Sequence, residues 1–312
     1  TSGIFRSWYS MGDVETASLL AVLLFFIVVL FFSIERYFNS RYKFNYSPNT
    51  KKFKNESPSF KNRIIIHFVC LIPIILGFLI PVLFIINNVI YEFSRIDFEK
   101  VFNLTTNTII ISLISSVIIV IIAVYFQFLK RIFKDRTITF FNELISLTYA
   151  LPGAVIGLSL ILLFTSYPFE NELLIGSFGI LVYAYVIRYM AVGISPLKSS
   201  FDKHPSSYDD TAFNLGMGPR KLFRSIHLPI NKSAISIAFL ITFVDIIKEL
   251  PITLILRPFN FDTLAVQTYE YAIEEMIPKS SIYSLAIVML GTILLIFLKK
   301  IVNKEIDVPR SK

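Results

Sequence analysis

Seven apolar stretches, each long enough to cross a lipid bilayer, constrain the fold of this chain more than any other feature of its sequence. A membrane-crossing helix needs about 20 apolar residues, because its backbone groups find no water inside the bilayer. Of the 312 residues, 54% are hydrophobic, which is high for a soluble domain. The sequence therefore predicts an all-α, polytopic membrane protein. The expected spans are 14–34, 64–90, 104–129, 141–165, 175–195, 233–256 and 281–298.

Basic residues gather in alternate connections between these stretches. The segments 36–63, 130–140, 196–232 and 299–312 hold eight, four, six and five of the 30 Lys and Arg residues. Because basic loops remain in the cytoplasm, the N-terminus is expected outside and the C-terminus in the cytoplasm. The net charge of +8 is thus explained by membrane topology, and no nucleic-acid partner is expected.

Residues that carry chemistry are few and scattered. A single cysteine, Cys70, excludes an internal disulfide and a cysteine metal site, and the three histidines lack zinc-site spacing. His204 and His227 are interpreted as polar loop residues. The sequence contains no GxxxxGK[ST] phosphate loop and no cluster of nucleophile, base or metal ligands. We therefore expect no enzyme activity, no metal and no cofactor in this chain.

The basic segment 36–63 divides the chain. Its charges follow the first apolar stretch, whereas those of a signal peptide precede the apolar core. A first helix that runs from outside to inside usually needs an earlier segment to orient it. Residues 1–35 are therefore interpreted as the last transmembrane helix of a preceding half, 36–63 as a cytoplasmic linker, and 64–312 as a six-helix unit.

The connection at 196–232 has local signals for two short helices. Ser206 followed by Asp209 has the spacing of a capping box, and a helix is expected over 207–214. Gly216 suits the left-handed position that closes such a helix. Pro219 suits the first position of the second helix, and Pro229 is expected to end it. Two short helices joined at a glycine would form a compact protrusion.

The same loop resembles the signature EAA-x3-G-x9-I-x-L-P of inner-membrane components of binding-protein-dependent ABC importers. Asp210 stands for Glu and Thr211 for Ala, and all other fixed positions match. The resemblance implies a MetI-like permease fold, in which this loop couples the spans to an ATPase. Ala212, Leu215 and Phe223 are expected as anchors in that interface. The expected coupling residues are Asp210, Thr211, Ala212, Gly216, Leu222, Phe223, Ile226, Leu228 and Pro229.

The resemblance also implies partners and a location. A permease of this type works in the inner (plasma) membrane, among lipids, with two copies of an ABC ATPase subunit. A periplasmic substrate-binding protein would deliver the substrate. The first permease half would be either fused upstream or a separate chain.

A narrower resemblance concerns the substrate. The stretch from Asp245 to Ala272 resembles the permeases of ferric-iron importers, and residues 1–35 resemble the end of the first half of such permeases. This implies iron(III) as the substrate. A thiamine-type or polyamine-type ABC permease is the nearest alternative. A secondary transporter is less favoured, because it would not need an ATPase-coupling loop.

Charged residues inside the predicted spans are candidates for a translocation path or gate. Asp245, Lys248 and Glu249 are expected on one face of the sixth span, with Arg188 as a partner for Asp245 or Glu249. An ion pair that only fixes helix packing, a route for a hard cation, and an early end of the span all remain open.

The segment 262–278 is expected outside, as an amphipathic helix at the membrane surface. With Arg257 and Asn260 before it, this segment is also a candidate contact for the binding protein.

Overall fold

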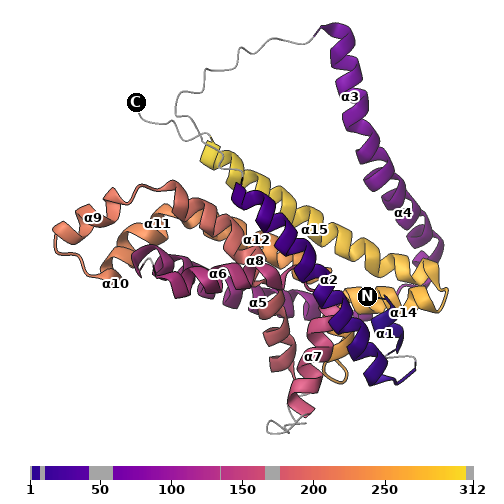
Figure 1. The fold of residues 1–312 in the computed structure, drawn as a ribbon. Helices are drawn as coiled ribbons and strands as arrows, with labels where there is room; N and C mark the ends of the chain where they lie inside the picture. The colour runs from indigo at the N-terminus through magenta and orange to yellow at the C-terminus, as the bar shows by residue number, and fades with distance from the viewer. Residues whose placement is uncertain (1, 8–10, 42–58, 134, 166–175, 307–312) are drawn as a thin grey trace.

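The computed structural model describes residues 2–7, 11–41, 59–133, 135–165 and 176–306 (Figure 1). Every regular element in these ranges is a helix, which confirms the all-α expectation. The longer helices are α2 (Val14–Arg41), α3 (Phe60–Ile74), α4 (Ile80–Glu92), α5 (Phe98–Phe133), α6 (Arg136–Thr148), α7 (Gly153–Thr165), α8 (Phe178–Lys203), α12 (Lys232–Ile247), α14 (Leu264–Ile273) and α15 (Ile277–Ile306). The shorter ones are α1 (Ser2–Phe5), η2 (Ile75–Leu79), η3 (Phe93–Arg95), α9 (Ser207–Asn214), α10 (Pro219–Leu222), η5 (Phe223–His227), α11 (Leu228–Ile230) and α13 (Pro251–Leu256).

Helices α5, α8 and α12 pack against one another and form the centre of the molecule, and α15 lies along α12. Small residues allow this close packing, as is usual between membrane helices. Gly193 of α8 is the clearest case, because a β-carbon added there would lie 2.6 Å from Cγ2 of Ile119 on α5. Ser112 and Ser115 on α5 are fully buried.

Two of the expected spans are broken rather than continuous. The stretch 141–165 divides into α6 and α7 around residues 149–152, and the stretch 233–256 divides into α12 and α13 around 248–250. A proline stands at the restart in both cases: Pro152 directly precedes α7, and Pro251 is the first residue of α13. Proline cannot donate the backbone hydrogen bond that would continue the preceding helix. Each of these two expected spans therefore consists of two helices.

Within the described residues, four helical segments are long and apolar enough to cross a membrane: Phe60–Arg95, Phe98–Phe133, Phe178–Lys203 and Ile277–Val302. A fifth results if Pro219–Ile230 and Lys232–Ile247, bent by 71°, are counted as one span. The apolar parts of α2 and α7 are shorter. Several membrane-capable helices are thus present, while the expected number of seven is not confirmed.

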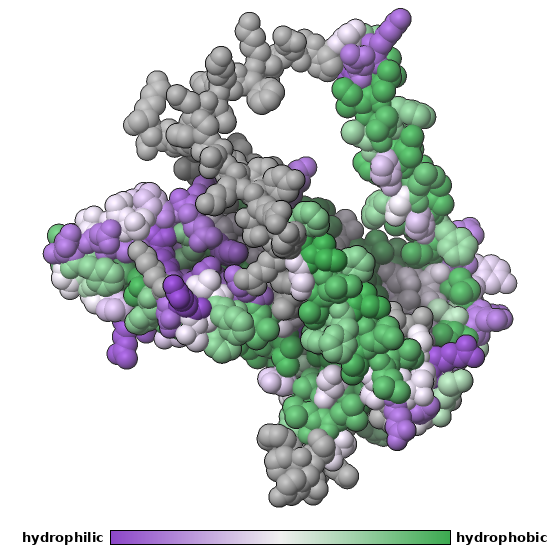
Figure 2. Space-filling view, viewed as in Figure 1, coloured by the Kyte–Doolittle hydropathy of each residue, from purple (hydrophilic) through white to green (hydrophobic). Residues whose placement is uncertain are grey.

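Helices α3 and α4 form a largely exposed apolar surface. No residue of α3 is buried, and α4 packs against α15 (Figure 1). Figure 2 shows that hydrophobic residues dominate this arm and also cover much of the body beside it. Soluble monomers rarely expose apolar patches of this size, whereas a bilayer accommodates them.

The π-helical turns η2 and η5 each end two residues before a proline. In η2 the N–H of Ile80 donates to the carbonyl of Ile75. In η5 the N–H of Leu228 donates to the carbonyl of Phe223. These wider turns let the helix continue past Pro81 and Pro229, which cannot make the α-helical bond. Pro229 therefore does not end the second short helix, as the sequence had suggested; the chain turns after Ile230 instead.

Candidate functional site

Residues 206–231, hereafter the lobe, form one end of the molecule, with α14 towards the other (Figure 1). Helix α9 covers the predicted residues 207–214. Gly216 has φ of +76°, the predicted left-handed conformation, and Pro219 is the first residue of α10. Local sequence chemistry thus correctly predicted the main elements of the lobe.

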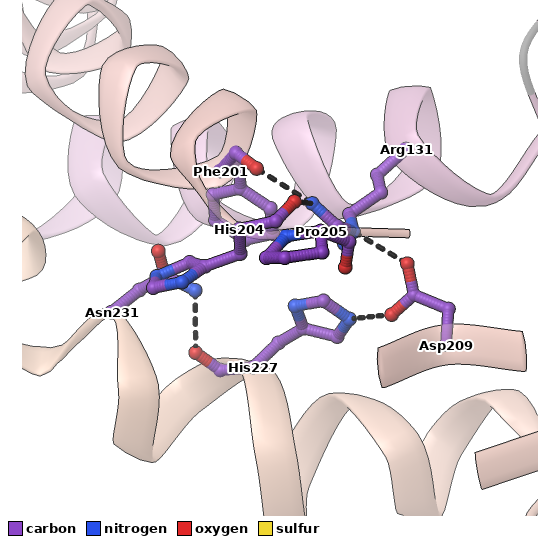
Figure 3. Close-up of polar contacts among 7 residues, drawn as sticks. All are labelled: Arg131, Phe201, His204, Pro205, Asp209, His227 and Asn231. Carbon is purple, nitrogen blue, oxygen red and sulfur yellow. Dashed lines mark hydrogen bonds and ion pairs between the residues drawn. The ribbon is translucent and has the colours of Figure 1, made fainter. Parts of the chain in front are cut away.

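The predicted capping box at the start of α9 is not formed. The Ser206 side chain makes no capping hydrogen bond. Asp209 instead turns inward, where one carboxylate oxygen lies 2.6 Å from Nε of Arg131 and the other 2.8 Å from Nε2 of His227 (Figure 3). A buried carboxylate needs such partners to offset its lost hydration. Asp209 consequently connects α9 to the end of α5 and to η5.

Arg131 binds the backbone as well as Asp209. Its Nη1 donates to the carbonyls of Phe201 at 2.6 Å and His204 at 3.0 Å, and its Nη2 donates to Pro205 at 2.7 Å (Figure 3). Carbonyls at the end of a helix lack partners within it, and a guanidinium carries enough donors to satisfy several of them. Arg131 therefore caps α8 and fixes the chain leading into α9.

His227 is buried, so its interpretation as a simple polar loop residue was wrong. Its ring stacks on Phe201, with 5.4 Å between ring centres. Burial lowers the pKa of the imidazole below its usual value, although the Asp209 carboxylate acts in the opposite direction. A neutral ring must carry its proton on Nε2 to bond the carboxylate. His227 is thus a donor that helps hold Asp209 in place.

Beneath these polar contacts, Phe128, Phe201, Ala212 and Leu222 form a small hydrophobic core. Phe223 packs at its edge against Phe128, with 4.8 Å between ring centres. Ala212 is therefore buried inside the lobe, where a partner protein cannot reach it. Leu222 is likewise internal.

The outer surface of the lobe combines exposed apolar and charged side chains. Leu215 is 77% exposed, and Tyr208 and Phe213 on α9 are also exposed. The sequence pattern missed Tyr208 and Phe213, because helical spacing alone does not tell which face of a short helix is open. The other expected coupling residues divide between exposed (Asp210, Thr211, Gly216, Pro229) and half-buried (Phe223, Ile226, Leu228). In Figure 2 this end is mostly hydrophilic, with apolar patches.

A second cluster lies where the two helix breaks meet. Nη1 of Arg188, on α8, donates to the carbonyl of Leu151 in the first break at 2.9 Å. Its Nε lies 3.5 Å from Oε2 of Glu249 in the second break. Glu249 also accepts hydrogen bonds from the Tyr189 hydroxyl and, at 3.2 Å, from the backbone N–H of Ile252. The partner of Arg188 is therefore Glu249, one of the two expected.

The charges expected on one face of the sixth span are separated by the break. Asp245 and Lys248 form an ion pair at 2.8 Å, in which Lys248 is 62% exposed. Glu249, which is only 6% exposed, lies apart from them in the second cluster. The helix ends at Ile247, so the i, i+4 geometry does not apply to Glu249.

Gly153 is expected to be essential for this packing, because a β-carbon there would lie 2.7 Å from Oε1 of Glu249 and 2.9 Å from Nη1 of Arg188. Gly153→Ala should lower stability by about 1–3 kcal/mol through overpacking. Gly291→Ala on α15 is the control, since its β-carbon would meet nothing within 4 Å. Thermal unfolding midpoints in detergent should fall for the first variant only. Equal unfolding midpoints for the two variants would contradict this, because they would show that the cluster has room for a β-carbon at position 153.

At the end of the molecule towards α14, Arg257 is engaged within the chain. It pairs with Asp262 and, at 2.8 Å, with Glu270. Asn260 adopts a left-handed conformation with φ of 60°, and Phe259 beside it is 93% exposed. The segment 262–278 contains the expected helix, α14, whose residues 264–267 are buried against the bundle.

In the described part of the chain, helices are the only regular elements and several of them are membrane-capable, which defines a multi-pass membrane protein. The chain belongs to the family of binding-protein-dependent transport system inner membrane components, which matches residues 131–308. This confirms the resemblance found in the coupling-loop residues. The family is a transport component and not an enzyme, as expected.

Individual relatives agree with the family. The chain is 25% identical over 305 residues to the Fe(3+)-transport system permease protein FbpB 2 of Haemophilus influenzae, covering 96% of this chain and 60% of that protein. It is 31% identical over 94 residues to the maltose/maltodextrin transport system permease protein MalG of Escherichia coli K12. That match covers 30% of this chain and 31% of MalG. The chain therefore spans about three fifths of the iron-permease relative.

Proposed function

We propose that this chain is a permease of an ABC importer that carries iron(III) received from a periplasmic binding protein. The observation that carries the proposal is the lobe, a protrusion that exposes Leu215 within the family-matched region. Iron is supported by the similarity to an iron permease along nearly the whole chain.

The lobe would dock in a separate ATPase subunit, of which two copies are expected. Exposed apolar side chains surrounded by charges are typical anchors of protein interfaces. Leu215, Tyr208 and Phe213 would be buried there, with Asp210 and Thr211 at the rim. Among the residues expected from the sequence, Ala212 and Leu222 would instead maintain the shape of the lobe.

For the topology we propose seven spans, with the lobe and the C-terminus in the cytoplasm. Residues 1–35 would end a first permease half, either fused or separate, and 64–312 would form the second. The proposed linker 36–63 lies mostly outside the described residues. The broken stretches 141–165 and 233–256 would each count as one discontinuous span, as is found around the binding sites of many transporters.

The two charged clusters would have different roles in translocation. Asp245 pairs with Lys248, whose side chain is largely exposed, and this pair would line a route for a cation. Glu249 is buried and Arg188 half-buried, and together they join both helix breaks; they would act as a gate whose opening separates them. On the outer side, Arg257 forms ion pairs with two acids of this chain. Phe259 and Asn260 would therefore be better placed than Arg257 to contact the binding protein.

Transport in proteoliposomes tests this proposal. The complete transporter, with its ATPase, other permease half and binding protein, should accumulate radioactive iron(III) only with ATP and the binding protein. Replacing the phosphate-loop lysine of the ATPase should abolish accumulation. Uptake of thiamine or putrescine in place of iron would select the alternative ABC substrates. Uptake that persists without the ATPase would select a secondary transporter.

A further inference from the structure

The Asp209 carboxylate is the point where three parts of the molecule meet. One of its oxygens binds Arg131 on α5 and the other binds His227 on η5. Arg131 in turn holds the last carbonyls of α8. A single carboxylate thus ties the start of the lobe, its second helix and the ends of two long membrane-type helices.

These contacts are strong and shielded from water. The side chains of Arg131 and Asp209 are only 12% and 10% exposed, and that of His227 is 3% exposed. Charge-assisted hydrogen bonds are roughly twice as strong as neutral ones, and shielding prevents water from replacing them. The neighbouring Asp210 is exposed. Of these two adjacent acids, therefore, Asp209 points into the protein and Asp210 points towards the surroundings.

Apolar packing alone, without the Asp209 contacts, would leave the lobe freer to move relative to α5 and α8. A cleft of about 320 Å³ lies beside the joint, lined by Arg131, Asp209, Asp210 and Phe213 among others. The covalent connections of the lobe are the irregular segment at 204–206 and the sharp turn at Asn231. Without the carboxylate, only the small core of Phe128, Phe201, Ala212 and Leu222 would restrain the lobe between these two connections, which would then serve as hinges.

We infer that Asp209 is a positioning residue that joins the lobe to α5 and α8 as one rigid unit, so that a displacement of the lobe moves these helices instead of bending the loop. The inference rests on the proposed function for the source of that displacement, the ATPase. It assigns a force-transmitting role to Asp209, Arg131 and His227, none of which belongs to the matched signature positions.

Distances between spin labels test the inference without reference to the substrate. Labels are placed at Asn214→Cys on α9 and Ile121→Cys on α5, two exposed positions, after Cys70→Ala has removed the only native cysteine. In the chain alone, the distance distribution should be narrow. In Asp209→Asn, the population at other distances should rise about tenfold or more, the factor expected when a charged hydrogen bond is lost. A broad distribution in the parent chain, or a narrow one in Asp209→Asn, would overturn the inference.

Two further variants separate positioning from general damage. Asp209→Glu keeps the carboxylate and should restore a narrow distribution. Asp202→Asn removes an exposed acid from the same region and should change nothing. With ATPase and ATP added, the α5–α9 distance should stay constant in the parent chain and shift in Asp209→Asn. Failure of the ATPase to co-purify with the parent chain would instead contradict the proposed function, and the result on the chain alone would still decide the role of Asp209.

Discussion

Replacing Gly216 with aspartate is expected to reduce ATP-driven uptake by more than about tenfold, the loss typical of disturbing a central interface contact. The amount of protein in the membrane should stay within about twofold, because aspartate is among the residues that tolerate a left-handed backbone. A β-carbon at Gly216 would meet no atom within 4 Å, so the chain itself has room for the new side chain. The surface that changes lies beside Leu215 and is the one proposed to face the ATPase.

Gly12→Asp is the matched control for this experiment. Gly12 also has a positive φ, of 65°, and open space around its β-carbon, but it lies in the segment before α2, away from the lobe (Figure 1). Both variants therefore add the same charge with the same backbone cost. Uptake and co-purification of the ATPase should fall only for Gly216→Asp. An equal loss for both variants would mean that the effect is general and not specific to docking.

Arg188→Leu is expected to destabilise the protein by about 3–5 kcal/mol, because it leaves the buried Glu249 carboxylate without its cation. The carbonyl of Leu151 would lose its donor as well. Since both helix breaks depend on this side chain, the amount of folded protein in the membrane and the uptake rate should fall together. Membrane yield, measured by fluorescence-detected size-exclusion chromatography, provides the test.

Asp245→Asn should behave differently, although it also removes one partner of an ion pair. Lys248 is largely exposed, and exposed ion pairs contribute only about 0–1 kcal/mol. Membrane yield should therefore be preserved, while uptake slows if Asp245 lines the route. Normal yield of Arg188→Leu, or equal losses of yield in both variants, would contradict the division into a packed gate and an open route.

The lobe was predictable where its structure depends on neighbouring residues in the chain. Gly216 and Pro219 encode their own backbone conformations, so the end of α9 and the start of α10 followed from the sequence. Pro229 gave a wrong prediction because its local effect is to end a helix. In the structure, the wider π-turn at 223–227 lets the helix continue past it. A local signal thus remains valid only when no neighbouring distortion compensates for it.

Features that depend on distant contacts were not predictable. Asp209 has the right spacing to cap α9, yet Arg131, 78 residues away in sequence, binds it more strongly as a charged partner. The first helix break was masked by apolar sequence, because hydrophobicity reports burial in lipid and not the continuity of a helix. The second break contains Lys248 and Glu249, which had left an early end of the span open. Pro152 and Pro251 were the signals shared by both breaks. They carry little weight in membrane helices, where proline is common.

Photo-crosslinking from position 215 tests the central claim most directly, namely that the lobe receives the motion of an ATPase inside the cell. A benzophenone amino acid replaces Leu215, which is 77% exposed, and a second variant carries it at Phe259, which is 93% exposed near α14. After irradiation of intact cells, the adduct from position 215 should contain the ATP-binding subunit, and the adduct from position 259 should not. An adduct of position 215 with the external binding protein, or of position 259 with the ATPase, would contradict the account.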